Sequence, residues 1–266
     1  MARGTYLTKN MNKQQIELML LLDDLELEIF TIPELKNITR NKYANLSELV
    51  ENLADKKILA RIERGKYCRS NFTDEKVIGC FMAGSGAVAY WSALNLHGLT
   101  DQFPNNIFIQ TNRPRKSKTV FGVPYKFVNI SPTKITGLLT EGQGNRQYRI
   151  TDPEKTIIDC FDLYQYSGGY AELISAFSRA KLNSNKMINY CKAIDNIAAI
   201  KRMGFLAQFM NKSGFDNFIE FARMKRNKAY NPFDPAGPDK GEFVNEWRLR
   251  LNISREEIMG ICSNFY

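Results

Sequence analysis

The sequence contains few of the residues that build metal centres and acid–base pairs. Its 266 residues include a single histidine, His97, and five cysteines that form no CxxC pair. A zinc site needs several such ligands at close spacing, and a histidine-based pair needs a partner, so we expect no metal, no cofactor and no catalytic residue. His97 is expected to fill a core or capping position at the end of an apolar helix. We interpret the scattered cysteines as small buried hydrophobic side chains: Cys68, Cys80, Cys160, Cys191 and Cys262.

Long hydrophobic runs are also scarce. An apolar run near the N-terminus, Met19 to Leu22, is followed at once by Asp23 and Asp24. A helix that spans a bilayer needs about 20 apolar residues, and a signal peptide needs an uninterrupted apolar segment. We therefore expect a cytoplasmic protein with no membrane partner.

An excess of positive charge on a globular composition is the main feature that is present. The formal net charge is +9, while 44% of the residues are hydrophobic and 12% are aromatic. This composition supports about two domains, each with its own core. The charge favours an anionic partner, most commonly nucleic acid. We predict an α+β protein in which residues 1–72 form a winged helix-turn-helix. Residues 73–266 are predicted to form a mixed α/β domain with a small sheet and a helical array.

Residues 30–69 carry the pattern that predicts the first domain. Thr31 and Glu34 form a capping box, which begins a short helix. Thr39 is expected to cap a second helix, and Arg64-Gly65 to form the turn of a two-stranded hairpin. A helix over 11–27 would pack behind these elements, with four residues on its inner side: Ile16, Met19, Leu20 and Leu25. This order of elements is typical of a winged helix-turn-helix.

In such a domain the second helix enters the major groove of DNA and the hairpin holds flanking phosphates. We predict groove contacts from four residues at the start of the second helix: Arg40, Asn41, Lys42 and Asn45. We predict phosphate contacts from three residues of the hairpin: Arg61, Arg64 and Lys66. The Tyr67 ring is expected to pack the hairpin onto the domain rather than stack on a base. The alternative is a small helical domain with a solvated charged hairpin, which would bind a protein.

The second domain is predicted from alternating helical and strand patterns. Residues 87–97 are expected to be helical, and 106–111 and 125–130 to be strands. Thr151-Asp152-Pro153-Glu154 begins another helix, with either Thr151 or Asp152 as its cap. Three further helices are expected between residues 183 and 226. The strand-like segment 247–253 is expected to return to the sheet.

Two groups of cations could form a second basic surface in this domain. One is the loop that joins the strands, with Arg113, Arg115, Lys116 and Lys118; the other is the late cluster of Arg223, Lys225 and Arg226. A functional interpretation is a second contact with nucleic acid or with an acidic partner. The alternative is a solubilising loop and the solvated outer faces of a helical bundle over 181–228.

Several acidic residues lie near one predicted helix and could be mistaken for a metal site. Their spacing scatters them over two faces of the helix and one of them caps it, so we assign them structural roles: Asp152, Glu154, Asp159 and Asp162. A rival interpretation is an enzyme that acts on nucleic acid, with the helix-turn-helix as its targeting module. Asp152, Asp159 and Asp162 would then be its candidate catalytic groups.

Taken together, these segments resemble the AbiEi family of bacterial antitoxins, which are transcriptional regulators of abortive-infection systems. The resemblance rests on an ordered set of motifs that spans nearly the whole chain: the 64–67 hairpin turn, the segment 91–100, the strand 107–111 with its basic loop, 151–155, the Gly168-Gly169 pair, and 234–249. Each motif is weak alone, whereas the ordered set is fairly specific.

The resemblance implies a function in phage defence. A family member would repress its own operon at inverted repeats in the promoter, which suggests two copies on DNA. It would also counteract a nucleotidyltransferase-like toxin encoded alongside, often without a stable protein complex. No catalytic residue of the family can be carried over. Two alternatives do not depend on the resemblance. The basic composition is compatible with a nonspecific nucleic-acid binder, and the helical N-terminal segment is compatible with a protein-interaction adaptor that has no role on DNA.

Overall fold

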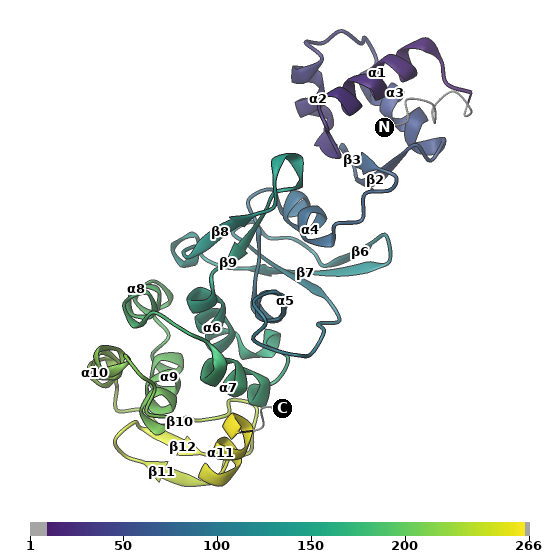
Figure 1. The fold of residues 1–266 in the computed structure, drawn as a ribbon. Helices are drawn as coiled ribbons and strands as arrows, with labels where there is room; N and C mark the ends of the chain where they lie inside the picture. Colours follow the sequence, from purple (N-terminus) through teal and green to yellow (C-terminus); the bar gives the residue numbers. More distant parts are fainter. Residues whose placement is uncertain (1–9, 264–266) are drawn as a thin grey trace.

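The computed structural model describes residues 10–263, so the outermost ends of the two predicted domains, 1–9 and 264–266, lie outside the described residues. The chain forms an elongated α+β structure with three parts in sequence order (Figure 1). A small helical unit with a three-stranded sheet occupies one end. A six-stranded sheet lies in the middle, and helices with a second three-stranded sheet form the other end.

The N-terminal unit is built from α1 (Lys13–Asp24), β1 (Ile29–Thr31), α2 (Ile32–Ile38), α3 (Leu46–Asp55), β2 (Leu59–Glu63) and β3 (Lys66–Arg69). Its antiparallel sheet has the order β1-β3-β2. The predicted capping box is confirmed, because Thr31 Oγ1 accepts from the Glu34 amide and the Glu34 carboxylate accepts from the Thr31 amide.

One prediction for this unit is right only in part, and another is wrong. Met19 is buried on the inner face of α1 as predicted and Ile16 is half-buried, whereas Leu20 and Leu25 are exposed. The inner face is completed by Gln15, Leu18 and Leu22, and Leu25 lies beyond the end of the helix. The second helix begins at Leu46 and not at Thr39, since Thr39 ends α2 and its hydroxyl donates to Leu35 O at 2.8 Å.

The central part begins with α4 (Glu75–Ala83), β4 (Ala87–Val88) and α5 (Tyr90–Leu96). The remaining strands are β5 (Ile107–Thr111), β6 (Lys118–Val120), β7 (Val123–Asn129), β8 (Leu138–Glu141) and β9 (Tyr148–Thr151). The sheet is mixed, in the order β6-β7-β5-β4-β9-β8. Both predicted strands are confirmed as β5 and β7. The predicted helix over 87–97 is wrong in its first turn, because Ala87 and Val88 pair with β5 and β9 as the strand β4.

The third part is mainly helical: α6 (Pro153–Asp162), α7 (Tyr170–Arg179), α8 (Ser184–Ile194), α9 (Ile197–Phe209) and α10 (Asp216–Lys225). Asp152 is the cap of α6, with Pro153 in the first turn. The chain then forms β10 (Asn231–Pro232), β11 (Glu242–Val244), β12 (Leu249–Leu251) and α11 (Arg255–Ser263). The expectation that 247–253 returns to the main sheet is wrong. This segment pairs with β10 and β11 in a separate sheet of order β10-β12-β11.

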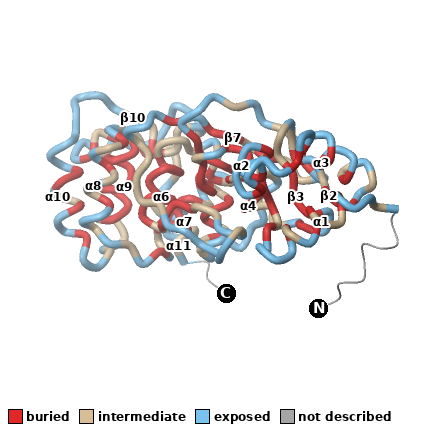
Figure 2. Tube along the Cα trace, turned by 90° about the horizontal axis from the view of Figure 1, so that it is seen from above, coloured by how far each residue is buried: buried red, intermediate tan, exposed pale blue. Residues whose placement is uncertain are grey.

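Buried residues run along the whole length of the molecule (Figure 2). One hydrophobic cluster joins the N-terminal unit to the central sheet, because Ile62 and Cys68 of its hairpin pack with Val77 of α4, Ile109 of β5 and Tyr125 of β7. The predicted domain boundary at residue 72 therefore lies between elements that share a core. Within residues 10–263, no helix has the length and apolar character needed to cross a membrane.

Candidate nucleic-acid interface

The predicted groove-contacting residues lie in and beside the turn between α2 and α3. Arg40 and Asn41 adopt left-handed backbone conformations, with φ of 49° and 56°. Asn45 occupies the N-cap position of α3, although its side chain makes no capping hydrogen bond. Together with Lys42 these side chains are exposed. The structure thus brings the four residues together, but on a turn and a helix end rather than along the face of a helix.

One of the four is held by an ion pair. Lys42 Nζ lies 2.8 Å from a carboxylate oxygen of Glu17 on α1. The hydrogen bond to Glu17 raises the pKa of Lys42, and the same bond lowers the pKa of Glu17. The pair is exposed and contributes little to stability, so Lys42 can exchange this carboxylate for another anion at small cost.

The outer face of α3 is acidic. Glu48, Glu51 and Asp55 are exposed there, and Arg61 of the hairpin lies 4.0 Å from Glu51. The Tyr67 hydroxyl donates to Glu51 at 3.3 Å, and its ring is buried and stacked on Phe30. The predicted packing role of Tyr67 is thus confirmed. The exposed cations Arg40 and Lys42 therefore lie in the turn before α3, whereas α3 itself carries no cation.

The hairpin presents an exposed cation at its tip. Arg64 lies beside Gly65, whose φ of 73° suits the tight turn. Lys66 is instead 22% exposed, because its ammonium donates to Phe81 O at 3.0 Å and Met82 O at 2.7 Å. It caps the C-terminal end of α4 and ties the hairpin to the central part of the molecule. The structure therefore places Lys66 away from the predicted phosphate-contacting set.

The basic loop between β5 and β6 reaches the same hairpin. Arg115 pairs with Glu63, and Lys118 Nζ lies 3.5 Å from the same carboxylate, which also pairs with Lys66 at 3.0 Å. Burial raises the pKa of Glu63, but the hydrogen bond to Lys66 and the charges of the three cations outweigh this, so its pKa is lowered. Glu63 was not among the residues predicted from the sequence. The only signal for it was one acid within the basic stretch of the hairpin.

The loop leaves two further cations exposed, Arg113 and Lys116. Their loop is held against the hairpin, because Arg115 and Lys118 both pair with Glu63. The first predicted basic group is therefore adjacent to the predicted DNA-binding residues.

The second predicted basic group lies at the opposite end of the molecule, on α10 (Figure 1). Arg223 pairs with Glu246 at 2.7 Å, and Arg226 donates to the backbone carbonyl of Glu246. Lys225 is exposed. The two predicted groups thus form separate surfaces.

The acidic residues around α6 are engaged in structural contacts. Asp152 accepts from the Lys155 amide at 2.8 Å and from the Tyr190 hydroxyl at 2.8 Å. Glu154 accepts from the amide of Asn183 at 2.8 Å. Asp162 and Asp159 pair with Lys134 and Lys155, respectively. Among residues 10–263, no group of three or more histidine, cysteine, aspartate and glutamate residues is arranged to hold a metal.

The histidine and most cysteines occupy the expected structural positions. His97 Nε2 donates to Thr151 O at 2.7 Å and links the end of α5 to β9. Four cysteines are buried, and burial raises the pKa of the Cys68 thiol to about 12 and of the Cys80 thiol to about 11. Cys262 is an exception, because it is partly exposed on α11.

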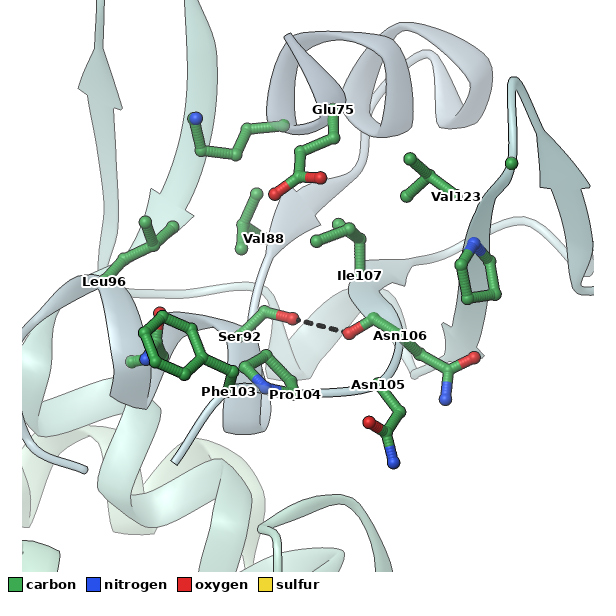
Figure 3. A pocket seen from close by; sticks show the side chains of 14 residues that line it. Glu75, Val88, Ser92, Leu96, Phe103, Pro104, Asn105, Asn106, Ile107 and Val123 are labelled. Carbon is green, nitrogen blue, oxygen red and sulfur yellow. Dashed lines mark hydrogen bonds between the residues drawn. The ribbon is translucent and has the colours of Figure 1, made fainter. Parts of the chain in front are cut away.

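A hollow of about 270 Å³ lies beside α4, α5 and the start of β5 (Figure 3). Ser92 donates to Asn106 O at 3.1 Å in its floor, and Phe103 stands at its rim, 82% exposed. The titratable side chains among its lining residues are Glu75 and Lys76. The hollow is a mixed polar and apolar depression whose lining residues include no nucleophile–base pair.

Comparison with known proteins identifies the fold but no family. No family model matches the chain, and no curated protein matches it. Among solved structures, the fold is similar to the crystal structure of the RV2827C protein from Mycobacterium tuberculosis, with a TM-score of 0.61 and 15% sequence identity. The similarity covers 88% of this chain and 89% of that one. Nearly the whole architecture is therefore shared with a solved protein.

Proposed function

We propose that this protein is a DNA-binding repressor whose N-terminal unit is a winged helix. The unit has the order helix, strand, helix, helix and hairpin, and its three-stranded sheet has the order β1-β3-β2. DNA-binding winged helices use this arrangement. The observation that carries the proposal is the exposure of Arg40 and Arg64. Within residues 10–263, neither guanidinium has a hydrogen bond or an ion pair, so each is available to a phosphate or a base edge.

The proposed contact surface is extended by the central part of the molecule. Asn41 and Asn45 supply amide groups that can pair with base edges next to Arg40. Arg113 and Lys116 supply further phosphate contacts next to Arg64, because Glu63 anchors their loop to the hairpin. Acidic residues on the outer face of α3 would repel the duplex, which limits the proposed contact to the start of that helix.

We further propose that the repression belongs to a toxin–antitoxin pair. This part rests on the ordered motifs that resemble AbiEi antitoxins. The cognate toxin would be nucleotidyltransferase-like, and the operator would contain inverted repeats read by two copies of the protein. The test is co-expression with the adjacent open reading frame. Rescue of growth by this chain is expected, and growth arrest that it does not relieve would contradict the antitoxin assignment.

The DNA-binding proposal is tested by a salt titration on the duplex upstream of the gene, with a scrambled duplex beside it. The Arg40→Ala/Arg64→Ala variant should lose the preference for the native duplex. If each arginine contacts one phosphate, the plot of log K against log salt concentration should also become less steep, with the magnitude of its negative slope reduced by about 1.8.

A matched control removes two exposed cations elsewhere, with Lys181→Ala/Lys192→Ala, and should keep both the preference and the slope. Equal binding of both duplexes by the wild-type protein would contradict sequence-specific repression. A monomer in gel filtration that binds single half-sites independently would contradict action as a pair.

A further inference from the structure

The outer face of the C-terminal sheet has an unusual composition. β12 buries Leu249 and Leu251 on its inner side, with exposed fractions of 0% and 3%. Arg250, between them, therefore points to the opposite, outer side. Arg248 lies in the turn just before the strand and is half-buried. Phe243 of β11 lies directly opposite Arg250 in the antiparallel pair and is 55% exposed. A large aromatic ring at this exposure lacks the cover that a core residue would have.

Tyr230 completes this face from the segment that leads into β10. Its ring packs edge-on against Phe243, with centroids 5.1 Å apart, and its hydroxyl accepts from Arg248 at 3.0 Å. The guanidinium carbons of Arg248 and Arg250 lie 5.3 Å and 5.0 Å from the centres of the Tyr230 and Phe243 rings. We call these four residues the aromatic platform: Tyr230, Phe243, Arg248 and Arg250.

The platform is held in place from inside the protein. Lys201 of α9 is completely buried, and its ammonium donates to Ala229 O at 2.7 Å and to Arg248 O at 3.3 Å. These bonds fix the backbone next to Tyr230 and at Arg248 itself. Side chains on a fixed backbone lose less conformational entropy when they bind a ligand. The platform is thus organised before any partner arrives.

The segment beside the platform is basic, and the acids near the platform are engaged in ion pairs: Glu242 with Arg255 and Glu246 with Arg223. Residues 223–230 are all exposed and include Lys225, Arg226 and Lys228. This segment lies against the platform, because Arg226 donates to the backbone carbonyl of Glu246 and Tyr230 donates to the side chain of Asn245. The acid next to Arg250 is Asp239, whose side chain is 91% exposed, and such an exposed pair is easily replaced by a phosphate.

We infer that the aromatic platform and the adjacent basic segment bind single-stranded RNA. Aromatic side chains within a positively charged surface are the general means of binding single strands, since bases stack on the rings while cations follow the phosphates. A duplex would not fit this chemistry, because its bases are already stacked on one another. RNA loops and ends commonly expose unstacked bases, which favours RNA as the source of the strand.

This inference goes beyond the proposed repressor function and is independent of it. The platform lies at the end of the molecule opposite to the N-terminal unit that carries Arg40 and Arg64 (Figure 1). Binding of RNA at one end and of duplex DNA at the other can therefore be separated by substitution.

The test is fluorescence anisotropy with the full chain and a labelled single-stranded RNA of about 12 nucleotides. Phe243→Leu keeps an apolar side chain but removes the stacking surface, and should weaken binding about five-fold or more. Phe243→Tyr should bind like the wild-type protein. A matched control, Phe103→Leu, changes an exposed aromatic residue in the α5–β5 connection and should have no effect. Circular dichroism establishes that each variant is folded.

Three outcomes would overturn the inference. The first is the absence of RNA binding by the wild-type protein, which would leave a protein as the partner of this face. The second is unchanged binding by Phe243→Leu. The third is tighter binding of single-stranded DNA or of duplex RNA of the same sequence. Arg40→Ala/Arg64→Ala should retain RNA binding, and its loss in that variant would assign the strand to the N-terminal unit instead.

Discussion

The buried pair of Lys155 and Asp159 on α6 allows a sharp test of how this fold is stabilised. The two side chains are 0% and 3% exposed and contact each other across one helical turn. Within the described residues, Asp159 Oδ2 has no hydrogen-bond partner, so the hydrogen bonding of the pair is incomplete. Desolvation of two charges is poorly compensated in such a pair, whereas removal of one partner leaves an isolated buried charge.

We expect Lys155→Met to lower the free energy of unfolding by about 3–5 kcal/mol at neutral pH. For a chain of this size, that cost corresponds to a decrease in Tm of roughly 6–20 °C. Lys155→Met/Asp159→Leu, which removes both charges, should be neutral or more stable than the wild-type protein. Thermal unfolding followed by circular dichroism measures all three proteins.

The cost of Lys155→Met should also depend on pH. Burial raises the pKa of Asp159 to about 6, even though Lys155 lowers it. The folded protein thus holds this proton more tightly than the unfolded chain, so the contribution of Asp159 favours folding at low pH and is lost as the pH rises through about 6. Removal of Lys155 raises that pKa further, and the variant should be more strongly destabilised at pH 8 than at pH 5. A single variant as stable as the wild-type protein at both pH values would refute the reasoning.

Two further predictions concern packing and the link between the hairpin and the basic loop. Glu63→Gln should lower stability by about 1 kcal/mol at neutral pH. The pKa of Glu63 is lower in the folded protein than in the unfolded chain, so the Glu63 carboxylate stabilises the fold above its unfolded pKa. This stabilisation should vanish as the pH falls through the folded pKa. An equal difference in Tm between the wild-type protein and Glu63→Gln at pH 7 and in acid would contradict this. Gly204→Ala places a Cβ 2.5 Å from the Trp247 ring and should cost about 1–3 kcal/mol. In Gly260→Ala on α11 the new Cβ would lie in open space, and the free energy of unfolding should instead rise by about 0.5–1 kcal/mol. If thermal unfolding shows that both substitutions change stability in the same direction, the reasoning is refuted.

Much of the local structure could be predicted because its causes lie within a few residues. The capping box at Thr31 and the Asp152-Pro153 start of α6 depend on hydrogen bonds between residues three apart, and both formed as expected. The strands β5 and β7 could be predicted for the same reason, because the alternation of side chains that indicates a strand is a local pattern. Ala87 and Val88 were misassigned because a two-residue strand has no period of its own and depends on its neighbours in the sheet.

The candidate interface was predictable in composition but not in geometry. A Thr followed by Arg-Asn-Lys suggested a helix start, yet the Thr39 hydroxyl bonds backward to Leu35 and the chain turns through Arg40 and Asn41 before α3 begins. No local signal showed that Lys66 would donate to the end of α4.

The pattern of charged and apolar residues along the chain was enough to indicate an α+β protein with an excess of cations near a helix–turn–helix–hairpin segment. Only the tertiary structure decided which cations are free. Pairing depends on groups far apart in the sequence: Glu63 holds Arg115 and Lys118, while Arg64 and Arg113 remain exposed. The tertiary structure also separated the two basic groups and placed Tyr230 and Phe243 on one face, because strand pairing joins segments that share no local pattern.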